Sequence, residues 1–258
     1  MGRDFLGDRV SQRYSAGLVP QGVSAELIAD RWKLSRTELD DFAATSHQRA
    51  AAAWKNGLFD SQVTYINDLH LDQTIRPDST VNSLAGLRLA FKNEHWEQRF
   101  PQIDWKVTAG NSSPVNDGSA AVMVTSDEAA RRLGLKPRAR VHSFAVTGDD
   151  PVFMLTGIIP ATTQVLARAG LSIDDIDVFE VNEAFASVVL AWQRETGADL
   201  TKVNINGGAT AIGHPLGASG ARLMTTLLNN LDQVGGRYGL QVMCEAGGLA
   251  NATIIERL

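Results

Sequence analysis

The spacing of apolar positions predicts a helical first part of the chain. Ser35 and Glu38 have the spacing of a capping box, which predicts a helix that begins there and ends at Gly57. Ser24 predicts a shorter helix, which it caps. The long helix carries an apolar stripe at helical spacing, made of Leu39, Phe42, Ala43, Ala50, Ala53 and Trp54. His47 lies on this helix, and we expect it to be a partly exposed surface residue without a function.

Strand and helix patterns alternate along the second part of the chain. Predicted strands cover residues 140–147, 177–181, 203–205, 238–243 and 251–257, and predicted helices cover 160–169, 184–196 and 217–230. Further upstream the pattern predicts a loop and short helix at 72–91, a polar extension at 94–101, a strand at 120–124, a helix from Ser126 and a linker at 136–138. The alternation indicates an α/β fold with a mixed, mostly parallel sheet and helices on its faces.

Composition excludes several classes of partner. A chain of 258 residues with a net charge of −5 has ample material for a core and lacks the basic surface of a nucleic-acid binder. Its single cysteine cannot form an intramolecular disulfide, which fits a reducing compartment. No apolar run approaches a membrane span, and the polar start is not typical of a signal peptide. We therefore expect a cytoplasmic protein that binds neither nucleic acid nor membrane.

A glycine-rich stretch at residues 204–222 presents one histidine in a predicted strand–turn–helix. Its glycines allow positive φ and close approach of a ligand, and Pro215 stiffens the backbone beside His214. The start of a helix also supplies N–H groups for a developing anion. The spacing matches neither a phosphate-binding loop nor a dinucleotide fingerprint. Taken alone, a histidine in such a turn is more often a structural cap than a functional group.

Two other stretches place chemically useful side chains just past a strand. Asn182 and Glu183 follow the predicted strand at 177–181, and Cys244 ends the strand that starts at Tyr238. Ligands of open α/β sheets bind at the carboxyl ends of strands. We therefore expect Asn182, His214 and Cys244 to meet in one site, although a lone free cysteine is more often a small buried hydrophobe.

These motifs together resemble the thiolase family, the acetyl-CoA C-acetyltransferases and 3-ketoacyl-CoA thiolases. The resemblance is carried by Asn-Glu-Ala-Phe-Ala at 182–186, by Gly-His-Pro-Leu-Gly-Ala-Ser-Gly at 213–220, by the cysteine–glycine run at 244–248 and by the small-residue run at 108–121. It extends from about Gly17 to the C-terminus. It implies a layered thiolase-like α/β fold.

The resemblance also implies a domain division. Residues 1–106 would form the loop domain that covers coenzyme A, together with the rest of the N-terminal region. Residues 107–136 would be the last strand and helix of the N-terminal half, and 137–258 would be the C-terminal domain.

The resemblance implies roles for individual residues. His214 and a water held by Asn182 would stabilise the enolate of a thioester, and Cys244 would move the proton at the α-carbon. Cys244 needs thiolate character for this, which backbone N–H groups and a neighbouring imidazole would favour. The backbone N–H of Ala246 would be an oxyanion donor. The substrate would be a coenzyme A thioester, with no metal and no other cofactor.

Two residues are expected to contact coenzyme A by the same resemblance. Ser113 would meet the pantetheine arm, although a turn serine that bonds its own backbone is an alternative. Arg76 would meet the nucleotide, although the sequence alone favours a solvated arginine.

The chain departs from the family pattern at two places. Ala246 stands where thiolases have the first of three glycines, and its Cβ narrows the conformations available to the donor loop. Residues 20–22 read Pro-Gln-Gly where many short-chain thiolases have His-Met-Gly, which leaves the acyl-chain length open.

The cysteine that carries the acyl group in thiolases has no counterpart among these 258 residues. We therefore expect a chain truncated at its N-terminus that lacks normal turnover by itself. The small residues at 217–221 would receive the absent central helix, and the full-length family assembles as dimers or tetramers. A non-catalytic acyl-CoA-binding module and a fragment with no independent fold, which aggregates through an uncovered apolar face, are the alternatives.

Overall fold

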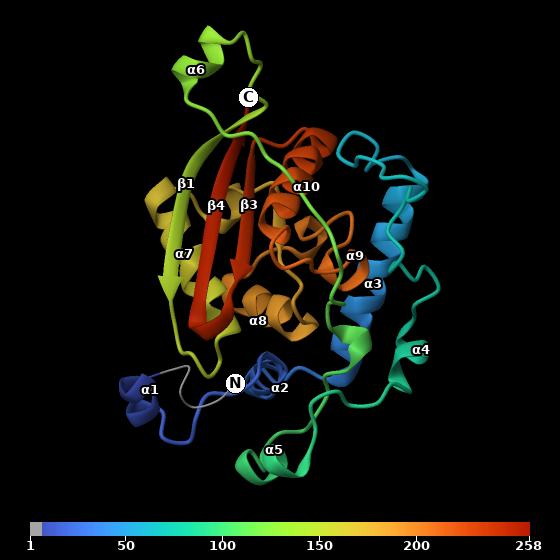
Figure 1. Ribbon diagram of the computed structural model, residues 1–258, viewed down its shortest axis with the longest axis vertical. Coiled ribbons are helices and arrows are strands. Elements are labelled where there is room, and N and C mark those ends of the chain that lie inside the picture. The colour runs from blue at the N-terminus through green and yellow to red at the C-terminus, as the bar shows by residue number, and fades with distance from the viewer. Residues whose placement is uncertain (1–6) are drawn as a thin grey trace.

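The computed structural model describes residues 7–258, and its centre is one four-stranded sheet (Figure 1). The strands lie in the order β1-β4-β3-β2. Their bounds are Ala139–Gly148 for β1, Val178–Val181 for β2, Tyr238–Cys244 for β3 and Leu249–Arg257 for β4. All four strands therefore come from the second half of the chain, as the alternating pattern predicts.

The sheet is mixed, which confirms the α/β expectation, but it is not mostly parallel. β1 pairs with β4 and β4 with β3 in antiparallel fashion, and only β2 and β3 are parallel. The reason lies in the connection between β3 and β4, which is a short turn at Ala246–Gly248. A parallel pair needs a long crossover, so strands joined by so short a turn must run antiparallel.

Helices cover both faces of the sheet (Figure 1). Side chains alternate along β4, so Ile254 and Ile255 point to opposite faces. Ile254 packs in the main core with residues of α7 (Ile158–Ala169) and α8 (Ala186–Thr196). Ile255 packs instead against Leu227 and Leu231 of α10, which spans Ser219–Val234. α10 begins in the glycine-rich stretch, so its position brings that stretch to the end of β2 and β3.

The remaining helices lie mainly in the first half of the chain. They are α1 (Gly7–Arg13), α2 (Gln21–Arg31), α3 (Arg36–Lys55), α4 (Val81–Ala85), α5 (Glu94–Arg99), α6 (Asp127–Arg132) and the single turn α9 (Ala209–Ile212). The capping box of Ser35 and Glu38 at the start of α3 is confirmed. Ser24, by contrast, does not cap α2, which follows Pro20; its hydroxyl donates to the carbonyl of Val152 at 2.6 Å.

Two predicted strands are wrong. Residues 120–124 have no regular secondary structure, and Val122, Met123 and Val124 are exposed. Residues 203–205 form only a single parallel bridge between Val203 and Phe179, because Asn204 turns the backbone away with φ 46°. β-Branched residues favour strands only where a neighbouring strand and a covering layer are present.

The domain boundaries at 106 and 136 stay predictions. The start of α10 is covered in part: Ala218 and Ser219 are buried, whereas Gly217 is exposed. The proposal that this helix start receives another helix therefore also stays a prediction.

His47 is not the surface residue that the helical pattern suggests. Its side chain is only 3% exposed, and its Nδ1 accepts the backbone N–H of Arg76 at 3.1 Å. The segment after α3 folds back over this face of the helix, which no local pattern reveals. Burial, with a smaller effect of the Arg76 charge, lowers the pKa of His47 from 6.5 to about 4.

We expect His47 to make the fold sensitive to acid. Between about pH 6.5 and pH 4 the unfolded chain binds a proton at this histidine and the folded chain does not, so stability falls as pH falls through that window. Replacing His47 by glutamine, which keeps an acceptor for Arg76, should flatten this part of the profile. The measurement is the free energy of unfolding in urea between pH 4 and 7.

His95→Gln, at an exposed position on α5, is the matched control and should keep the wild-type profile. A profile of His47→Gln that is parallel to wild type across the whole window would contradict the account.

Candidate active site

Asn182 is held at the end of β2 by two kinds of hydrogen bond. Its backbone N–H donates to the carbonyl of Val242 on β3 at 3.0 Å, which extends the parallel ladder by one residue. The side chain of Asn204 takes the place of a neighbouring strand: its Oδ1 accepts the N–H of Val181 and its Nδ2 donates to the Val181 carbonyl, both at 2.9 Å. This explains why the predicted strand at 203–205 is replaced by a turn whose side chain does the pairing.

His214 is presented from a turn that only glycine permits. Gly213 has φ 84°, and a Cβ there would lie 2.3 Å from the side chain of Asn116. The backbone N–H of His214 donates to the carbonyl of Pro114 at 3.0 Å, which fixes the turn against the loop before it. The imidazole is half-buried.

The structure brings Asn182 and His214 together. Nδ2 of Asn182 lies 3.4 Å from Nε2 of His214, and Nδ1 of His214 lies 2.5 Å from Oγ of Ser219. The Ser219 hydroxyl donates to the carbonyl of Pro215 at 2.9 Å, so it must accept the proton on Nδ1. Nε2 then carries a lone pair, which accepts from the Asn182 amide. The three side chains form one hydrogen-bonded row.

The ring is neutral in this row. Burial, and to a smaller extent the positive charge of Arg222, lowers the pKa of His214 below its ordinary value. Stabilising an oxyanion requires an N–H on Nε2, which a second neutral arrangement supplies: Ser219 turns its hydroxyl from Pro215 onto Nδ1, and the ring proton sits on Nε2. In that arrangement Nε2–H and the Asn182 NH₂ are both donors, so their mutual hydrogen bond is lost and both can donate to an anionic oxygen placed between them.

Cys244 ends β3 at the same edge of the sheet, two residues beyond the carbonyl that pairs with Asn182. It is 6% exposed and lies in the main core, with no hydrogen bond to Asn182 or His214. Burial raises the pKa of the Cys244 thiol to about 12, and the neighbouring Glu245 carboxylate adds to this. The expected thiolate character is therefore wrong for this structure: desolvation outweighs any local N–H donors, and the group is a thiol at neutral pH.

The other predicted site residues, Ser113, Ala246 and Arg76, are not part of this hydrogen-bonded row. Ser113 is beside it: its N–H and its hydroxyl both donate to the carbonyl of Ala184, at 3.1 and 3.2 Å. Its hydroxyl is thus bonded to the backbone of a distant segment and not to its own turn, and its expected contact with coenzyme A stays a prediction. Ala246 is exposed in the turn after Cys244, where the following Gly247 and Gly248 take positive φ. Arg76 is exposed in the segment between α3 and α4.

Glu183 is a central residue that the sequence did not single out. Its carboxylate accepts the Ser46 hydroxyl of α3 at 2.7 Å, the Asn204 amide at 2.8 Å and the backbone N–H of Thr210 at 3.0 Å. A Cβ at Gly208 would lie 2.4 Å from this carboxylate. Glu183 therefore ties α3, the end of β2 and the glycine-rich turn together. Its place next to Asn182 was the only signal in the sequence.

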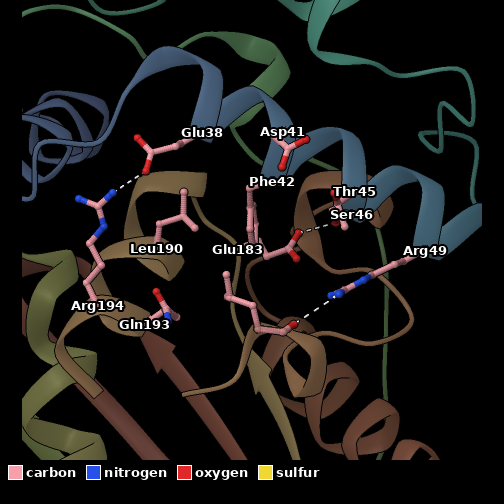
Figure 2. A pocket seen from close by; sticks show the side chains of 11 residues that line it. Glu38, Asp41, Phe42, Thr45, Ser46, Arg49, Glu183, Leu190, Gln193 and Arg194 are labelled. Carbon is pink, nitrogen blue, oxygen red and sulfur yellow. Dashed lines mark hydrogen bonds and ion pairs between the residues drawn. The ribbon is translucent and has the colours of Figure 1, made fainter. Parts of the chain in front are cut away.

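A separate pocket opens on the other side of Glu183, between α3 and α8 (Figure 2). It has a volume of about 280 Å³ and is lined by Glu38, Asp41, Arg49, Arg194 and the apolar Leu190, among others. Figure 2 shows the Ser46 hydroxyl bonded to Glu183 at the rim, with Arg194 turned toward Glu38. Neither Asn182, His214 nor Cys244 lines it, so it is distinct from the candidate active site.

Residues 7–258 contain no group of three or more His, Cys, Asp or Glu side chains that could hold a metal ion. None of the helices described is long and apolar enough to cross a membrane.

The sequence matches two descriptions of the thiolase family. Residues 9–128 match "Thiolase, N-terminal domain" and residues 135–257 match "Thiolase, C-terminal domain". The chain belongs to the thiolase family. The family expectation drawn from the sequence motifs is thereby confirmed.

The chain is also similar to individual thiolases. It is 47% identical to a steroid 3-ketoacyl-CoA thiolase of Mycobacterium tuberculosis, over 95% of this chain and 58% of that protein. It is 43% identical to a 3-ketoacyl-CoA thiolase of Klebsiella pneumoniae, over 95% of this chain and 63% of that protein. The chain thus spans about three fifths of the length of these relatives.

Solved structures show the same fold. An acetyl-CoA acetyltransferase of Bacillus anthracis superimposes with a TM-score of 0.84 at 36% identity, over 93% of this chain and 60% of that one. The human mitochondrial 3-ketoacyl-CoA thiolase, solved in complex with CoA, gives 0.83 at 35% identity, over 98% of this chain and 61% of that one. The expected thiolase-like α/β fold is confirmed.

We expect Ser219 to decide which nitrogen of His214 carries the proton. Ser219→Ala removes the acceptor of the Nδ1 proton, so the tautomer with the proton on Nδ1 should lose its preference, by about 0.5–1.5 kcal/mol for one neutral hydrogen bond. Nitrogen-15 shifts of the imidazole, which differ strongly between protonated and bare ring nitrogens, measure this directly.

Ser219→Thr keeps the hydroxyl and is the matched control. Equal tautomer populations in wild type and in the alanine variant, with both folded, would show that the 2.5 Å contact does not position the ring.

Proposed function

We propose that this chain carries the enolate-stabilising part of a thiolase-type acyl-CoA acyltransferase, which performs reversible Claisen condensation or thiolysis of 3-ketoacyl-CoA. The observation that supports it most is the hydrogen-bonded row of Asn182, His214 and Ser219 at the sheet edge next to Cys244. The relatives named as 3-ketoacyl-CoA thiolases share this part of their sequence with the chain.

The hydrogen-bond donors of His214 and Asn182 match the negative charge that such a reaction creates. Cleaving or forming the carbon–carbon bond passes through an enolate, whose negative charge lies on the thioester oxygen. Nε2–H of His214 and a water on the Asn182 amide would donate to that oxygen from a largely buried site, where each donor is worth about 2.7–4 kcal/mol of barrier. A neutral ring suits this role, since it can donate without bringing a charge that needs its own counter-ion.

Cys244 would carry the proton. In the cleavage direction the neutral thiol donates its proton to the α-carbon of the enolate: the S–H bond breaks, a C–H bond forms, and the negative charge passes to sulfur. The raised pKa of Cys244 makes the thiol form available for this step at neutral pH. In the condensation direction the same proton must leave the α-carbon, and the small thiolate fraction limits the rate.

Coenzyme A would lie along the surface between the row and the segment after α3. Ser113, adjacent to Ala184, would meet the pantetheine arm by turning its hydroxyl from the Ala184 carbonyl. Exposed Arg76 would meet the nucleotide phosphates, and the N–H of Ala246 would be a further oxyanion donor. Full-length relatives would assemble as homo-oligomers in the cytoplasm, and that arrangement is part of the proposal.

The 258 residues contain one cysteine, and the proposal assigns it to proton transfer. No second thiol is then present in this chain to hold the acyl group, so the chain alone should not turn over. A non-catalytic acyl-CoA-binding module remains the second candidate, because binding requires only the loops around Ser113 and Arg76.

Turnover and ligand binding by the purified chain test this assignment. With acetoacetyl-CoA and CoA we expect no formation of acetyl-CoA, but a thermal melt that rises when acetyl-CoA is added, because ligand binding to the folded state stabilises it. Ser113→Ala should reduce the rise in melting temperature, and Glu128→Gln, exposed on α6, is the control that should not.

Turnover at the rate of an intact thiolase would refute the assignment of Cys244. No cooperative melt would favour a fragment without its own fold.

Hydrogen–deuterium exchange at the α-carbon of acetyl-CoA distinguishes a site that stabilises an enolate from a module that only binds the thioester. In deuterated water the chain should exchange the α-protons of acetyl-CoA, faster as the pH rises because only the thiolate of Cys244 removes them. Cys244→Ala and His214→Ala should each lower the rate by about a hundredfold or more. Binding by the wild type with exchange no faster than in these variants would favour the binding module, and mass spectrometry of the recovered acetyl-CoA reads the outcome.

A further inference from the structure

All buried side-chain polar atoms that lack a hydrogen-bond partner within residues 7–258 lie in one layer of the molecule. They are Oε2 of Glu180, Oδ1 of Asn182, Oγ1 of Thr210, Oε1 of Gln241 and all three nitrogens of Arg222. Native proteins leave few buried polar groups unpaired, and a cluster of them calls for an explanation.

The topology explains why these atoms meet. Glu180 and Gln241 are opposite one another in the parallel pair of β2 and β3, on the face that packs against α10. Asn182 follows Glu180 by two residues on that face. Arg222, Thr226 and Asn230 lie four residues apart on α10, and Nδ2 of Asn230 donates to Oε1 of Glu180 at 2.9 Å. Arg222 is thus on the face of α10 that points at the unpaired oxygens.

Donors and acceptors in the layer are complementary. A guanidinium has only donors, and Arg222 provides all the unpaired nitrogens. The remaining unpaired atoms are oxygens from β2, β3 and α9. A guanidinium that is buried without any partner is strongly unfavourable, whereas one that reaches several oxygens through bridging water is not.

Asn182 connects this layer to the candidate active site. Its Nδ2 faces His214, and its Oδ1 is buried and unpaired, on the residue that continues the α10-facing side of β2. An amide can turn by 180° and exchange its donor and its acceptor, so something must select the orientation. A donor-only group behind Oδ1 selects the orientation in which the NH₂ faces the imidazole and the substrate.

We propose that Arg222 is a positioning residue of the candidate active site, whose N–H groups donate through bridging water to Oδ1 of Asn182 and Oε2 of Glu180. This fixes the amide NH₂ of Asn182 toward His214 and holds a positive charge behind the ring. The inference rests on the proposed function for its catalytic meaning, but the hydrogen bonds can be tested in the free chain.

Titratable groups of both signs surround the imidazole ring of His214. Arg222 from α10 interacts with the carboxylates of Glu180 on β2, of Glu183 after it and of the half-buried Asp72 in the segment after α3. The exposed Asp117, the neutral thiol of Cys244 and the neighbouring Glu245 lie on the other segments around the turn. Within this set, Arg222 is the group that lowers the pKa of His214 besides burial itself.

The test is nuclear magnetic resonance of the nitrogen-15-labelled chain without ligand. Arg222→Met removes the donors and the charge, so the pKa of His214 should rise by about one unit, a tenfold change in its protonation constant. The two side-chain amide protons of Asn182 should shift as the amide becomes free to turn. Arg222→Lys keeps the charge and should leave the His214 pKa within about 0.3 unit of wild type.

Arg131→Met, exposed on α6, is the matched control and should change neither signal. An unchanged His214 pKa and unchanged Asn182 amide signals in a folded Arg222→Met chain would overturn the proposal. If that variant does not fold, the wild type still decides: the guanidinium N–H signals of Arg222 should be visible and exchange slowly, and fast exchange with solvent would overturn the proposal. Neither readout depends on turnover, so the proposed function can fail while this inference stands.

Discussion

The anchoring of the chain just after β2 is the constraint on which the rest of the structure depends. Two side chains provide it: Asn204 pairs with the last residue of the strand, and the Glu183 carboxylate collects donors from α3, the 204 turn and α9. These bonds are buried, where a lost partner costs about 1–3 kcal/mol. They place Asn182 at the sheet edge and the glycine-rich turn above it, so the site is fixed by buried polar contacts rather than by apolar packing.

The cost of burying charge explains the chemistry of the site. Its histidine and its cysteine are both held in their neutral forms by desolvation, in opposite pKa directions. A neutral imidazole with one nitrogen bonded to Ser219 can offer either a lone pair or an N–H on the other nitrogen. A neutral thiol can give a proton but takes one only slowly. Burial therefore keeps both groups uncharged, as the proposed roles of His214 as an oxyanion donor and of Cys244 as a proton donor require.

Sequence patterns predicted those parts of the fold that depend on local signals. The capping box at Ser35, the strands near β1, β3 and β4, and the order of motifs that identifies the family are all local, and the structure confirms them. The predictions that failed depended on distant contacts. The strand at 120–124 lacks a neighbour, His47 is covered by the segment that follows α3, and the Cys244 thiol is neutral because other elements bury it. The same holds for Arg222, whose role appears only when β2, β3 and α10 come together.

The account is tested most directly by a crystal structure of this chain with a bound coenzyme A thioester. The account predicts the thioester oxygen within about 3 Å of Nε2 of His214, with the α-carbon facing the sulfur of Cys244. A thioester group bound elsewhere, for example in the pocket between α3 and α8, with Asn182 and His214 untouched, would contradict it.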